Sequence, residues 1–262
     1  MMPLMSPPDA AVTEWRAIAQ EPDLLYNVLS WPDKREGWTE ADFYAAGTSD
    51  WEDFARHWTH YATALAGHCV EIGCGVGRIT RCLEGAFARV TALDVSADMI
   101  GRARAVTGDR VTFGQVDGAQ IPIGDRQADA LFSVHVMQHL ENQRVLDAYI
   151  AEMARVLRPG ATAMVHIPVQ GAPPARPWRR IQAELTLRGS RRSLRAGRGH
   201  STMRTNAYWL DDVWRAFAAA GFADVELRMI PVRSNGYGHQ FWLARAAAAM
   251  AATVRRSKSE AV

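Results

Sequence analysis

Residues 69–80 constrain the fold more than any other part of the chain. They read CVEIGCGVGRIT, so an apolar strand runs directly into three alternating glycines and then into the start of a helix. Glycine lets the backbone pass close to a ligand where a Cβ would collide, and the apolar run suits a parallel strand covered on both faces. Asp94 ends the next apolar run, where a carboxylate can accept hydrogen bonds from ribose hydroxyls. The pattern predicts an α/β fold with a nucleotide-shaped pocket.

The spacing of the glycines argues against a dinucleotide as the ligand. Dinucleotide-binding loops read G-x-G-x-x-G, and their third glycine allows close packing of helix and strand. Here the glycines are Gly73, Gly75 and Gly77, and Arg78 stands where that third glycine is needed. Glu71 would also place a negative charge near a pyrophosphate. Both departures disfavour NAD.

The rest of the chain predicts alternating strands and helices. Strands are predicted at 68–72, 89–94, 110–116, 128–134 and 160–167. The helices between them are predicted at about 77–86, 97–106 and 142–157. This alternation implies right-handed crossovers and a parallel sheet. Further helices are expected at 9–20, 51–66 and 209–220, and two last strands read VELRMI and HQFWLAR, joined by PVRSNGYG. Residues 31–47 read as loop and short helix.

With these motifs the chain resembles the class I S-adenosylmethionine (SAM) dependent methyltransferases, whose first motif has the form E/D-x-G-x-G-x-G. Three further segments follow in order, namely LDVSADMI at 93–100, QVDGAQIPIGDRQADALFSV at 115–134 and RVLRPGATAMVHI at 155–167. Four ordered motifs are more specific than one glycine loop. The resemblance implies a Rossmann-like, doubly wound seven-stranded sheet, mostly parallel with the last strand antiparallel, and an N-terminal helical lid.

The resemblance also suggests a division of the chain. Residues 1–66 are expected to form the lid, 67–245 the SAM-binding domain with a basic insertion at 170–207, and 246–262 a tail. Only Glu184 opposes the arginines of the insertion, which are Arg176, Arg179, Arg180, Arg188, Arg191, Arg192, Arg195, Arg198 and Arg204. The insertion reads as a solvated lid, as a clamp for an anionic acceptor, or as a contact with nucleic acid or an acidic membrane. Few aromatic residues interleave the arginines, which disfavours base stacking.

By the same resemblance, cofactor contacts are expected from Glu71, Gly73, Cys74, Gly75, Gly77, Asp94, Val95, Met99, Asp117, Gly118, Ala119 and Val134. Glu71 would orient the methionine ammonium, and Asp94 would take the ribose hydroxyls. Asp117 and the backbone of the next two residues would bind the adenine edge, while Val95 and Met99 flank the ring. Asp94 and Asp117 could instead cap local structure, and the two apolar side chains could belong to the core.

The segment after strand 128–134 bears on the acceptor. It reads HVMQHL and lacks the N/D-P-P-Y/F pattern of adenine amino-group methylation, and it places His135 and His139 one helical turn apart if it is helical. A hydroxyl is a poor nucleophile until it loses its proton, and imidazole, with a reference pKa of about 6.5, suits that task. The sequence therefore favours O-methylation. His135 and His166, each near a strand end, are catalytic candidates; His139 is either a third or a packing residue.

Convergence of these histidines raises the hypothesis of a divalent metal as a second cofactor. Mg²⁺ on the acceptor hydroxyl would lower its pKa, although Mg²⁺ prefers oxygen ligands and a histidine pair suits zinc or a base. Further ligands could come from the lid, at Glu40, Asp42, His57 and His60, unless these are solvated helix faces.

The HVMQHL segment and the helix after it resemble those of methyltransferases associated with glycan and natural-product pathways. This resemblance implies a hydroxylated small molecule as the acceptor, namely a sugar, an oligosaccharide or a glycosylated natural product. Tyr237 and His239 are candidates for its pocket, because their loop should lie at the cofactor edge. Aromatic side chains in the lid could stack on sugar faces or form lid core: Trp31, Trp38, Tyr44, Trp51 and Trp58.

Composition narrows the partners. The 262 residues carry a net charge of +2, so bulk charge points to neither nucleic acid nor membrane. The sequence shows no secretory signal pattern and no run near the roughly 20 apolar residues that a bilayer span needs. Cys69, Cys74 and Cys82 lack metal-site spacing and read as reduced thiols of a cytoplasmic protein. Two alternatives stay open: an RNA or protein methyltransferase that grips phosphate with the insertion, and a SAM-binding module without catalysis.

Overall fold

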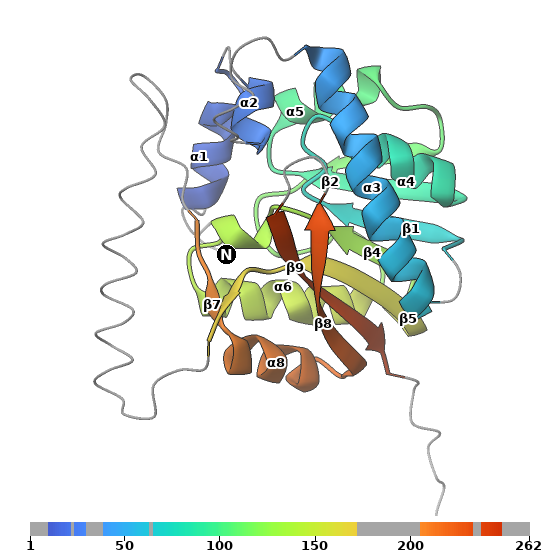
Figure 1. The fold of residues 1–262 in the computed structure, drawn as a ribbon, viewed down its shortest axis with the longest axis vertical. Helices are drawn as coiled ribbons and strands as arrows, with labels where there is room; N and C mark the ends of the chain where they lie inside the picture. Colours follow the sequence, from blue (N-terminus) through green and yellow to red (C-terminus); the bar gives the residue numbers. More distant parts are fainter. Residues whose placement is uncertain are drawn as a thin grey trace, which may run out of the picture.

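A seven-stranded sheet forms the centre of the computed structural model, which describes residues 10–21, 24–29, 39–62, 65–171, 205–232 and 237–247. The strands lie in the order β3-β2-β1-β4-β5-β9-β8 (Figure 1). Their bounds are β1 (His68–Ile72), β2 (Arg89–Asp94), β3 (Val111–Gln115), β4 (Ala128–Ser133), β5 (Leu157–His166), β8 (Phe222–Val232) and β9 (Tyr237–Ala246). Only β9 runs against its neighbours β5 and β8, while the other pairs are parallel. The predicted fold class is confirmed.

The parallel register brings several strand ends to one edge of the sheet. Ile72 at the end of β1 pairs with Leu93 near the end of β2, and β4 pairs in parallel with β1 and β5. Because β9 is antiparallel, its amino end reaches the edge where β5 ends, with His166 opposite Phe241. The glycine loop, Asp94 and the segments after β4 and β5 therefore meet at this edge, as expected for ligand sites in open α/β sheets.

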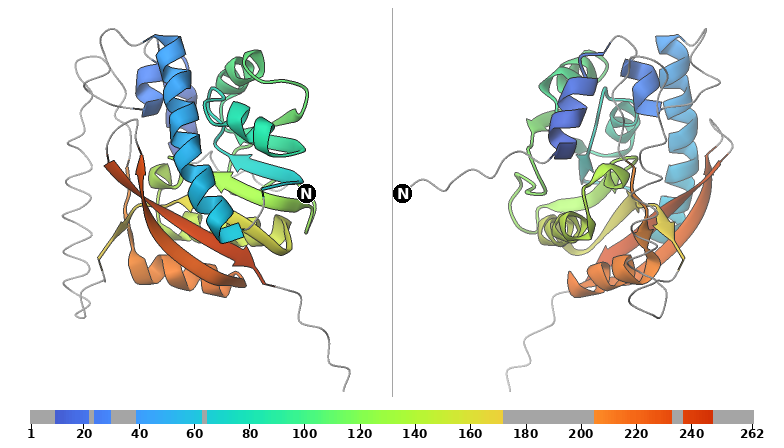
Figure 2. Two further views of the ribbon diagram at one scale, coloured as in Figure 1. Left: turned by 45° about the vertical axis from the view of Figure 1, so that its right-hand side comes forward. Right: turned by 90° about the vertical axis from the view of Figure 1, so that its left-hand side faces the viewer.

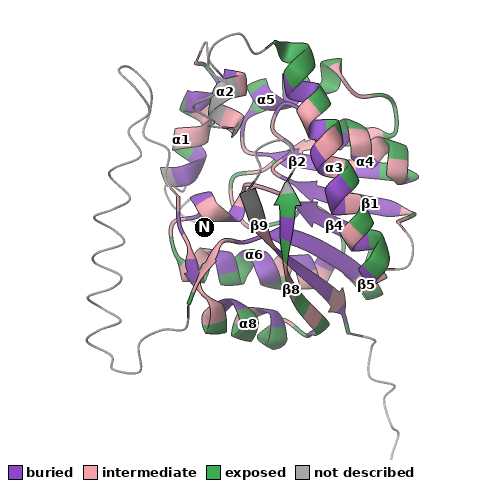
Figure 3. Ribbon diagram, in the orientation of Figure 1, coloured by how far each residue is buried: buried purple, intermediate pink, exposed green. Residues whose placement is uncertain are grey.

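Helices cover both faces of the sheet, so the domain has three layers (Figure 2). On one face, apolar side chains of α6 (Gln143–Val156) and α8 (Leu210–Ala219) pack with strand residues such as Val70 and Trp242. On the other, α3 (Glu40–Ala62), α4 (Thr80–Ala86) and α5 (Ala97–Ala105) pack with Phe132 and Phe241. The central strands are buried almost throughout (Figure 3), which explains why they read as apolar runs.

Helix α3 is longer than the sequence predicts, because it begins at Glu40 and not near residue 51. Thr39 and Asp42 form a reciprocal cap: the Asp42 N–H donates to the Thr39 hydroxyl at 3.2 Å, and the Thr39 N–H donates to the Asp42 carboxylate at 3.0 Å. Gly47 lies inside the helix, where a Cβ would come within 2.6 Å of the Arg78 Cγ atom. This glycine allows close packing and does not end the helix.

Two short helices, α1 (Ala10–Ile18) and α2 (Leu24–Leu29), pack against the side of the domain that carries the glycine loop. Ile18 and Leu24 share an apolar cluster with Val76 and Met99, and the Arg16 Nε atom donates to the Val95 carbonyl at 2.9 Å. A second, two-stranded sheet pairs β6 (Val169–Gln170) with β7 (Tyr208–Trp209).

Most of the basic insertion, residues 172–204, lies outside the described residues, as does the tail from 248. Among the helices that the structure describes, none is long and apolar enough to cross a bilayer.

Candidate active site

An open cavity of about 810 Å³ lies at the carboxyl edge of the sheet. Its floor comes from the strand ends and the loops after β1, β2 and β4, and its cover comes from α1 and α2. The lining residues are Ala11, Val12, Trp15, Val28, Ile72, Gly73, Gly75, Leu93, Asp94, Val95, Met99, Val116, Val134, His135, Val136, His139, Leu140 and Tyr149. The cavity is mostly apolar, and its titratable groups are Asp94, His135, His139 and Tyr149.

The three glycines of the loop serve two purposes. All have left-handed backbones, with φ values of 77° at Gly73, 53° at Gly75 and 86° at Gly77, a conformation that side chains disfavour. Gly73 and Gly75 line the cavity, whereas a Cβ at Gly77 would lie 3.1 Å from the Ala103 Cα atom of α5. Gly77, predicted to contact the cofactor, thus lies outside the cavity lining and allows α5 to pack closely.

Asp94 lies at the centre of the cavity floor and is 7% exposed. One carboxylate oxygen accepts the Gly75 N–H at 2.8 Å, and the other accepts the Ser96 N–H at 3.0 Å. Burial raises the pKa of this carboxyl from its usual value. The N-cap of α5 is Ser96, whose hydroxyl accepts the Met99 N–H at 3.3 Å, so Asp94 is not the capping residue. Its two oxygens keep lone pairs for a ligand.

Glu71 lies beneath the glycine loop and does not line the cavity. Alternation along β1 turns Ile72 toward the cavity and Glu71 toward the opposite face. It is 2% exposed, and burial raises its pKa to about 7. Its Oε2 atom has no hydrogen-bond partner among the described residues. Cys74 is likewise buried in the apolar cluster below the loop, and only its backbone takes part in the turn, donating to the Leu93 carbonyl at 3.0 Å.

The predicted adenine contacts after β3 lie beside the cavity and not on its wall. Asp117 is exposed, the Gly118 carbonyl accepts the Tyr149 hydroxyl at 3.1 Å, and Ala119 packs against the core. On this side of the cavity the wall is formed by Val116, which follows β3, and by Tyr149 of α6.

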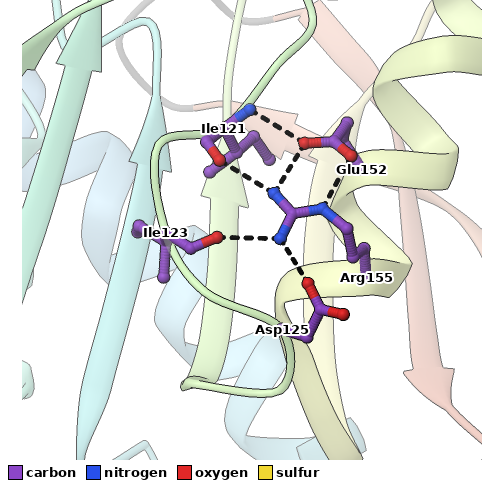
Figure 4. Close-up of polar contacts among 5 residues, drawn as sticks. All are labelled: Ile121, Ile123, Asp125, Glu152 and Arg155. Carbon is purple, nitrogen blue, oxygen red and sulfur yellow. Dashed lines mark hydrogen bonds and ion pairs between the residues drawn. The ribbon is translucent and has the colours of Figure 1, made fainter.

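A single arginine of α6 holds the rest of that loop in place (Figure 4). The Arg155 guanidinium donates to the carbonyls of Ile121 and Ile123, each at 2.8 Å, and to the Asp125 carboxylate at 2.7 Å. Glu152 accepts from the same guanidinium and from the Ile121 N–H. The network fixes residues 121–125 to α6 and so supports the neighbouring wall of the cavity.

Several predicted acceptor residues have structural roles. The Tyr44 hydroxyl donates to the Val76 carbonyl at 2.9 Å inside a buried cluster, so Tyr44 does not line the cavity. Trp58 is buried, with its indole N–H donating to Thr162 at 3.0 Å, and Trp51 packs on Phe132. Trp31, Trp38 and the side chain of Tyr237 lie outside what the structure describes.

Three histidines meet near the cavity, but not the three that the sequence predicts. The ring centres are 4.9 Å apart for His135 and His166, 5.0 Å for His135 and His239, and 5.2 Å for His166 and His239. His139 instead packs edge-on against Trp15 at 4.8 Å, and one ring nitrogen lies 3.0 Å from the Gln138 amide. We call His135, His166 and His239 the histidine cluster.

The predicted helical turn between His135 and His139 is wrong. Only η2 (Met137–His139), a short 3-10 helix, forms there, and His135 has a left-handed backbone with a φ of 60°. That backbone turns the His135 side chain away from the direction that a continuous helix would give it. His239 was expected only as an acceptor residue; that an antiparallel last strand would bring it to the other two rings could not be read from spacing.

The histidine cluster is uncharged near neutral pH. Burial lowers the pKa of His135 well below its usual value and that of His166 to about 3, with the neighbouring imidazoles adding to the effect. Burial also lowers the pKa of His239. The predicted lid ligands do not join this group: Glu40, Asp42 and His60 are exposed on α3, and the described residues contain no other metal-competent group of three.

Residues 70–165 match the family model of the methyltransferase domain. The glycine loop, Asp94 and His135 all lie within this segment, which is similar to a methyltransferase domain. The chain is 31% identical over 108 residues to the O-methyltransferase cnsE of Penicillium expansum. The aligned segment covers 39% of this chain and 38% of cnsE. It is 34% identical over 116 residues to the methyltransferase GfsG of Streptomyces halstedii, at 40% of each protein. The chain thus spans less than half the length of these curated relatives.

Solved structures share the fold of this chain. Magnesium protoporphyrin IX methyltransferase from Synechocystis, solved with bound SAM, aligns with a TM-score of 0.58 over 94% of this chain and all of its own, at 16% identity. The match supports the architecture of the sheet that places the strand ends at one edge.

The sequence did not predict that side chains of α1, including Trp15, cover the cavity. An amphipathic helix shows which of its faces is apolar but not which surface that face contacts.

Proposed function

We propose that this methyltransferase transfers the methyl group of SAM to a hydroxyl of a small molecule. One observation carries the proposal: a single cavity joins the glycine loop and Asp94 to His135. The first two suit an adenosyl cofactor, and His135 lies where the hydroxyl proton of an alcohol would leave. Relatives named as O-methyltransferases support the acceptor atom, and fold neighbours solved with SAM or its demethylated product support the cofactor.

The residues of the site fit this cofactor. Asp94 lies buried with lone pairs toward the cavity and would accept hydrogen bonds from both ribose hydroxyls. The backbone at Gly73 and Gly75 leaves room for the methionine part. Val95 and Met99 line the cavity where the adenine would lie. The unpartnered Oε2 atom of Glu71, which lies beneath the loop, would reach the ammonium through a bridging water. Asp117 would reach the adenine edge from its exposed position only if the loop shifts toward the cavity.

We further propose that α1 and α2 form the lid. Val12 and Trp15 cover the cavity, and Arg16 ties α1 to the end of β2. α3 packs against the sheet and belongs to the domain itself. A lid that excludes water strengthens electrostatic interactions inside the site.

The cofactor supplies an electrophilic methyl group on a sulfonium. The acceptor oxygen forms a bond to the methyl carbon as the carbon–sulfur bond breaks, which leaves a neutral thioether, and the hydroxyl proton leaves at the end of the cavity where His135 lies. Reaction requires the two atoms to be held about 3 to 3.5 Å apart in line. The apolar walls formed by Val134, Val136 and Leu140 fix the acceptor and exclude competing water.

The acceptor that we propose is a hydroxylated small molecule; a sugar or glycosylated natural product remains our candidate within that class. Its support is now limited to the sequence resemblance, since Trp51 and Trp58 pack inside the domain.

The test begins with calorimetry of SAM and of its demethylated product on the purified chain. Binding of both, with Asp94→Ala weakened strongly, supports the cofactor assignment; uptake of NAD and no heat with SAM would refute it. A panel of hydroxylated acceptors with methyl-labelled SAM then tests transfer. Turnover insensitive to salt on a small acceptor supports the proposal. Steep loss of activity with salt on RNA would favour the phosphate-gripping alternative, and SAM binding without transfer to any acceptor would favour a non-catalytic module.

A further inference from the structure

The histidine cluster is built from three separate segments of the chain. His135 follows β4, His166 ends β5, and His239 lies in β9. One ring nitrogen from each histidine can serve as a metal ligand, and these three nitrogens lie within 4.8 Å of one another. Adjacent β4, β5 and β9 bring them together, so the cluster is a property of the sheet edge and not of one flexible loop.

The size of the cluster matches a single ion held by three imidazoles. Because the ring centres form a nearly equilateral triangle, a central point lies about 2.9 Å from each, the mean side divided by √3. A zinc ion bound to nitrogen at about 2.1 Å lies about 3.2 Å from the ring centre. The triangle of ring centres therefore has the size that one ion held by three imidazoles requires. Tetrahedral ligand nitrogens are about 3.4 Å apart, so ring nitrogens that lie up to 4.8 Å apart in the ion-free protein would approach one another by up to about 1.4 Å on binding.

An independent feature of the cluster points to a missing partner. His166 is 4% exposed, and its Nδ1 atom has no hydrogen-bond partner among the described residues. Buried polar atoms are nearly always paired, and an unpaired one calls for an explanation such as an ion. His135 adds a left-handed backbone in a residue that carries a side chain. Such strain costs of the order of 1 kcal/mol or more, and it is concentrated at functional sites.

The electrostatic surroundings allow a cation. Metal binding requires imidazole in its neutral form. The described charged groups beside the cluster include Arg78 and Asp50, which form a buried ion pair at 2.6 Å and so add no net charge. Both act on His239 in opposite directions. The second Asp50 carboxylate oxygen has no hydrogen-bond partner among the described residues.

The donor set decides the class of ion. Three nitrogen ligands suit zinc, iron, cobalt or nickel, whereas Mg²⁺ prefers carboxylate, carbonyl and water oxygens. The Mg²⁺ expected from the sequence does not fit this cluster. Three protein ligands also leave coordination positions open, as in catalytic zinc sites.

We propose that His135, His166 and His239 bind one divalent transition-metal ion of the zinc class, with an open position toward the cavity that His135 lines. In its role, which rests on the proposed function, this ion coordinates the acceptor hydroxyl and favours release of its proton to water. The alkoxide oxygen then bonds to the methyl carbon while the carbon–sulfur bond breaks and the sulfonium becomes a thioether. His135 acts as a ligand and not as the proton acceptor.

Metal binding can be tested without any methyl acceptor. Chelator-treated protein is titrated with Co²⁺, whose visible absorption reports nitrogen coordination, and with Zn²⁺ by calorimetry. We expect one ion per chain. His135→Asn keeps a residue type that tolerates a left-handed backbone, and His239→Gln replaces a half-buried ring, so both variants should fold by circular dichroism. Each is expected to weaken binding by 100-fold or more. His139→Gln, which removes the cavity histidine outside the cluster, is the matched control and should bind Co²⁺ as the unmodified chain does.

Absence of Co²⁺ uptake by the unmodified chain, or equal uptake by folded His135→Asn and His239→Gln, would overturn the metal site. Calorimetry with SAM separates this inference from the proposed function. Metal uptake without SAM binding would sustain the site and remove the methyltransferase role. Full turnover of the chelator-treated chain would sustain that role and overturn the metal's part in it.

Discussion

Replacement of Glu71 by glutamine should make the protein more stable at alkaline pH. Burial raises the pKa of Glu71 from 4.5 to about 7. Between these values the folded chain holds a proton that the unfolded chain has released, so the stability due to this group is fully present below pH 4.5 and is lost as pH rises toward 7 and above. The difference of about 2.5 pKa units corresponds to about 3 kcal/mol. Glutamine keeps the shape and removes the ionisation.

Urea denaturation of the ligand-free chain at pH 5 and pH 8 measures the effect. At pH 5 the free energy of unfolding should differ little between the unmodified chain and Glu71→Gln. At pH 8 the variant should have the higher free energy of unfolding, by about 2 to 3 kcal/mol. Glu40→Gln is the control, because Glu40 is an exposed glutamate in the first turn of α3. In Glu40→Gln, the free energy of unfolding should change between pH 5 and pH 8 by as much as it does in the unmodified chain.

An equal stability difference between Glu71→Gln and the unmodified chain at both pH values would refute the reasoning, because it would mean that Glu71 is ionised throughout. A second measurement connects the residue to the site. If Glu71 accepts a hydrogen bond from the cofactor ammonium, calorimetry at pH 8 should show weaker SAM binding by the glutamine variant. Unchanged affinity would leave Glu71 as a purely structural group.

Three further substitutions test separate parts of the site. Asp94→Ala should weaken SAM binding by at least 10-fold in calorimetry, since the proposed ribose acceptor is lost together with the bond to Gly75; retained affinity would contradict the cofactor site. Tyr44→Phe removes the bond to the Val76 carbonyl and should cost about 1 kcal/mol in urea denaturation with kcat unchanged, and a large fall in kcat would restore Tyr44 to the acceptor pocket. Gly77→Ala should lower the free energy of unfolding by at least about 1 kcal/mol, because its backbone is left-handed and its Cβ would press on α5; equal stability would argue against that packing role.

Local sequence was sufficient for the sheet and the cofactor end of the cavity. β1 (His68–Ile72) and β2 (Arg89–Asp94) lie where the apolar runs predict them, because strands buried on both faces leave a continuous apolar pattern. Gly73, Gly75 and Asp94 line the cavity as expected. The positions of these residues depend on short turns that directly follow β1 and β2, so the local sequence is enough to predict them.

Side-chain partners across distant segments could not be predicted in this way. Tyr44 and Trp58 read equally well as surface stacking groups and as core, and only the packing of α3 on the sheet buries them. Residues 31–47 read as loop and short helix, whereas Gly47 lies inside α3 and packs closely on Arg78. In each case the deciding neighbour is far away in sequence, where periodicity gives no information.

The sequence by itself determined the order of the strands along the chain and the position of Asp94 in the cavity, because each depends on contiguous motifs. Only the tertiary structure decided which histidines meet. It separated His139 from the others through a left-handed residue and a short 3-10 helix, and it brought in His239 through the antiparallel β9. The physical reason is that the direction of a side chain depends on the backbone conformation at its own position and on the register of strands that the sheet pairs across long distances in sequence.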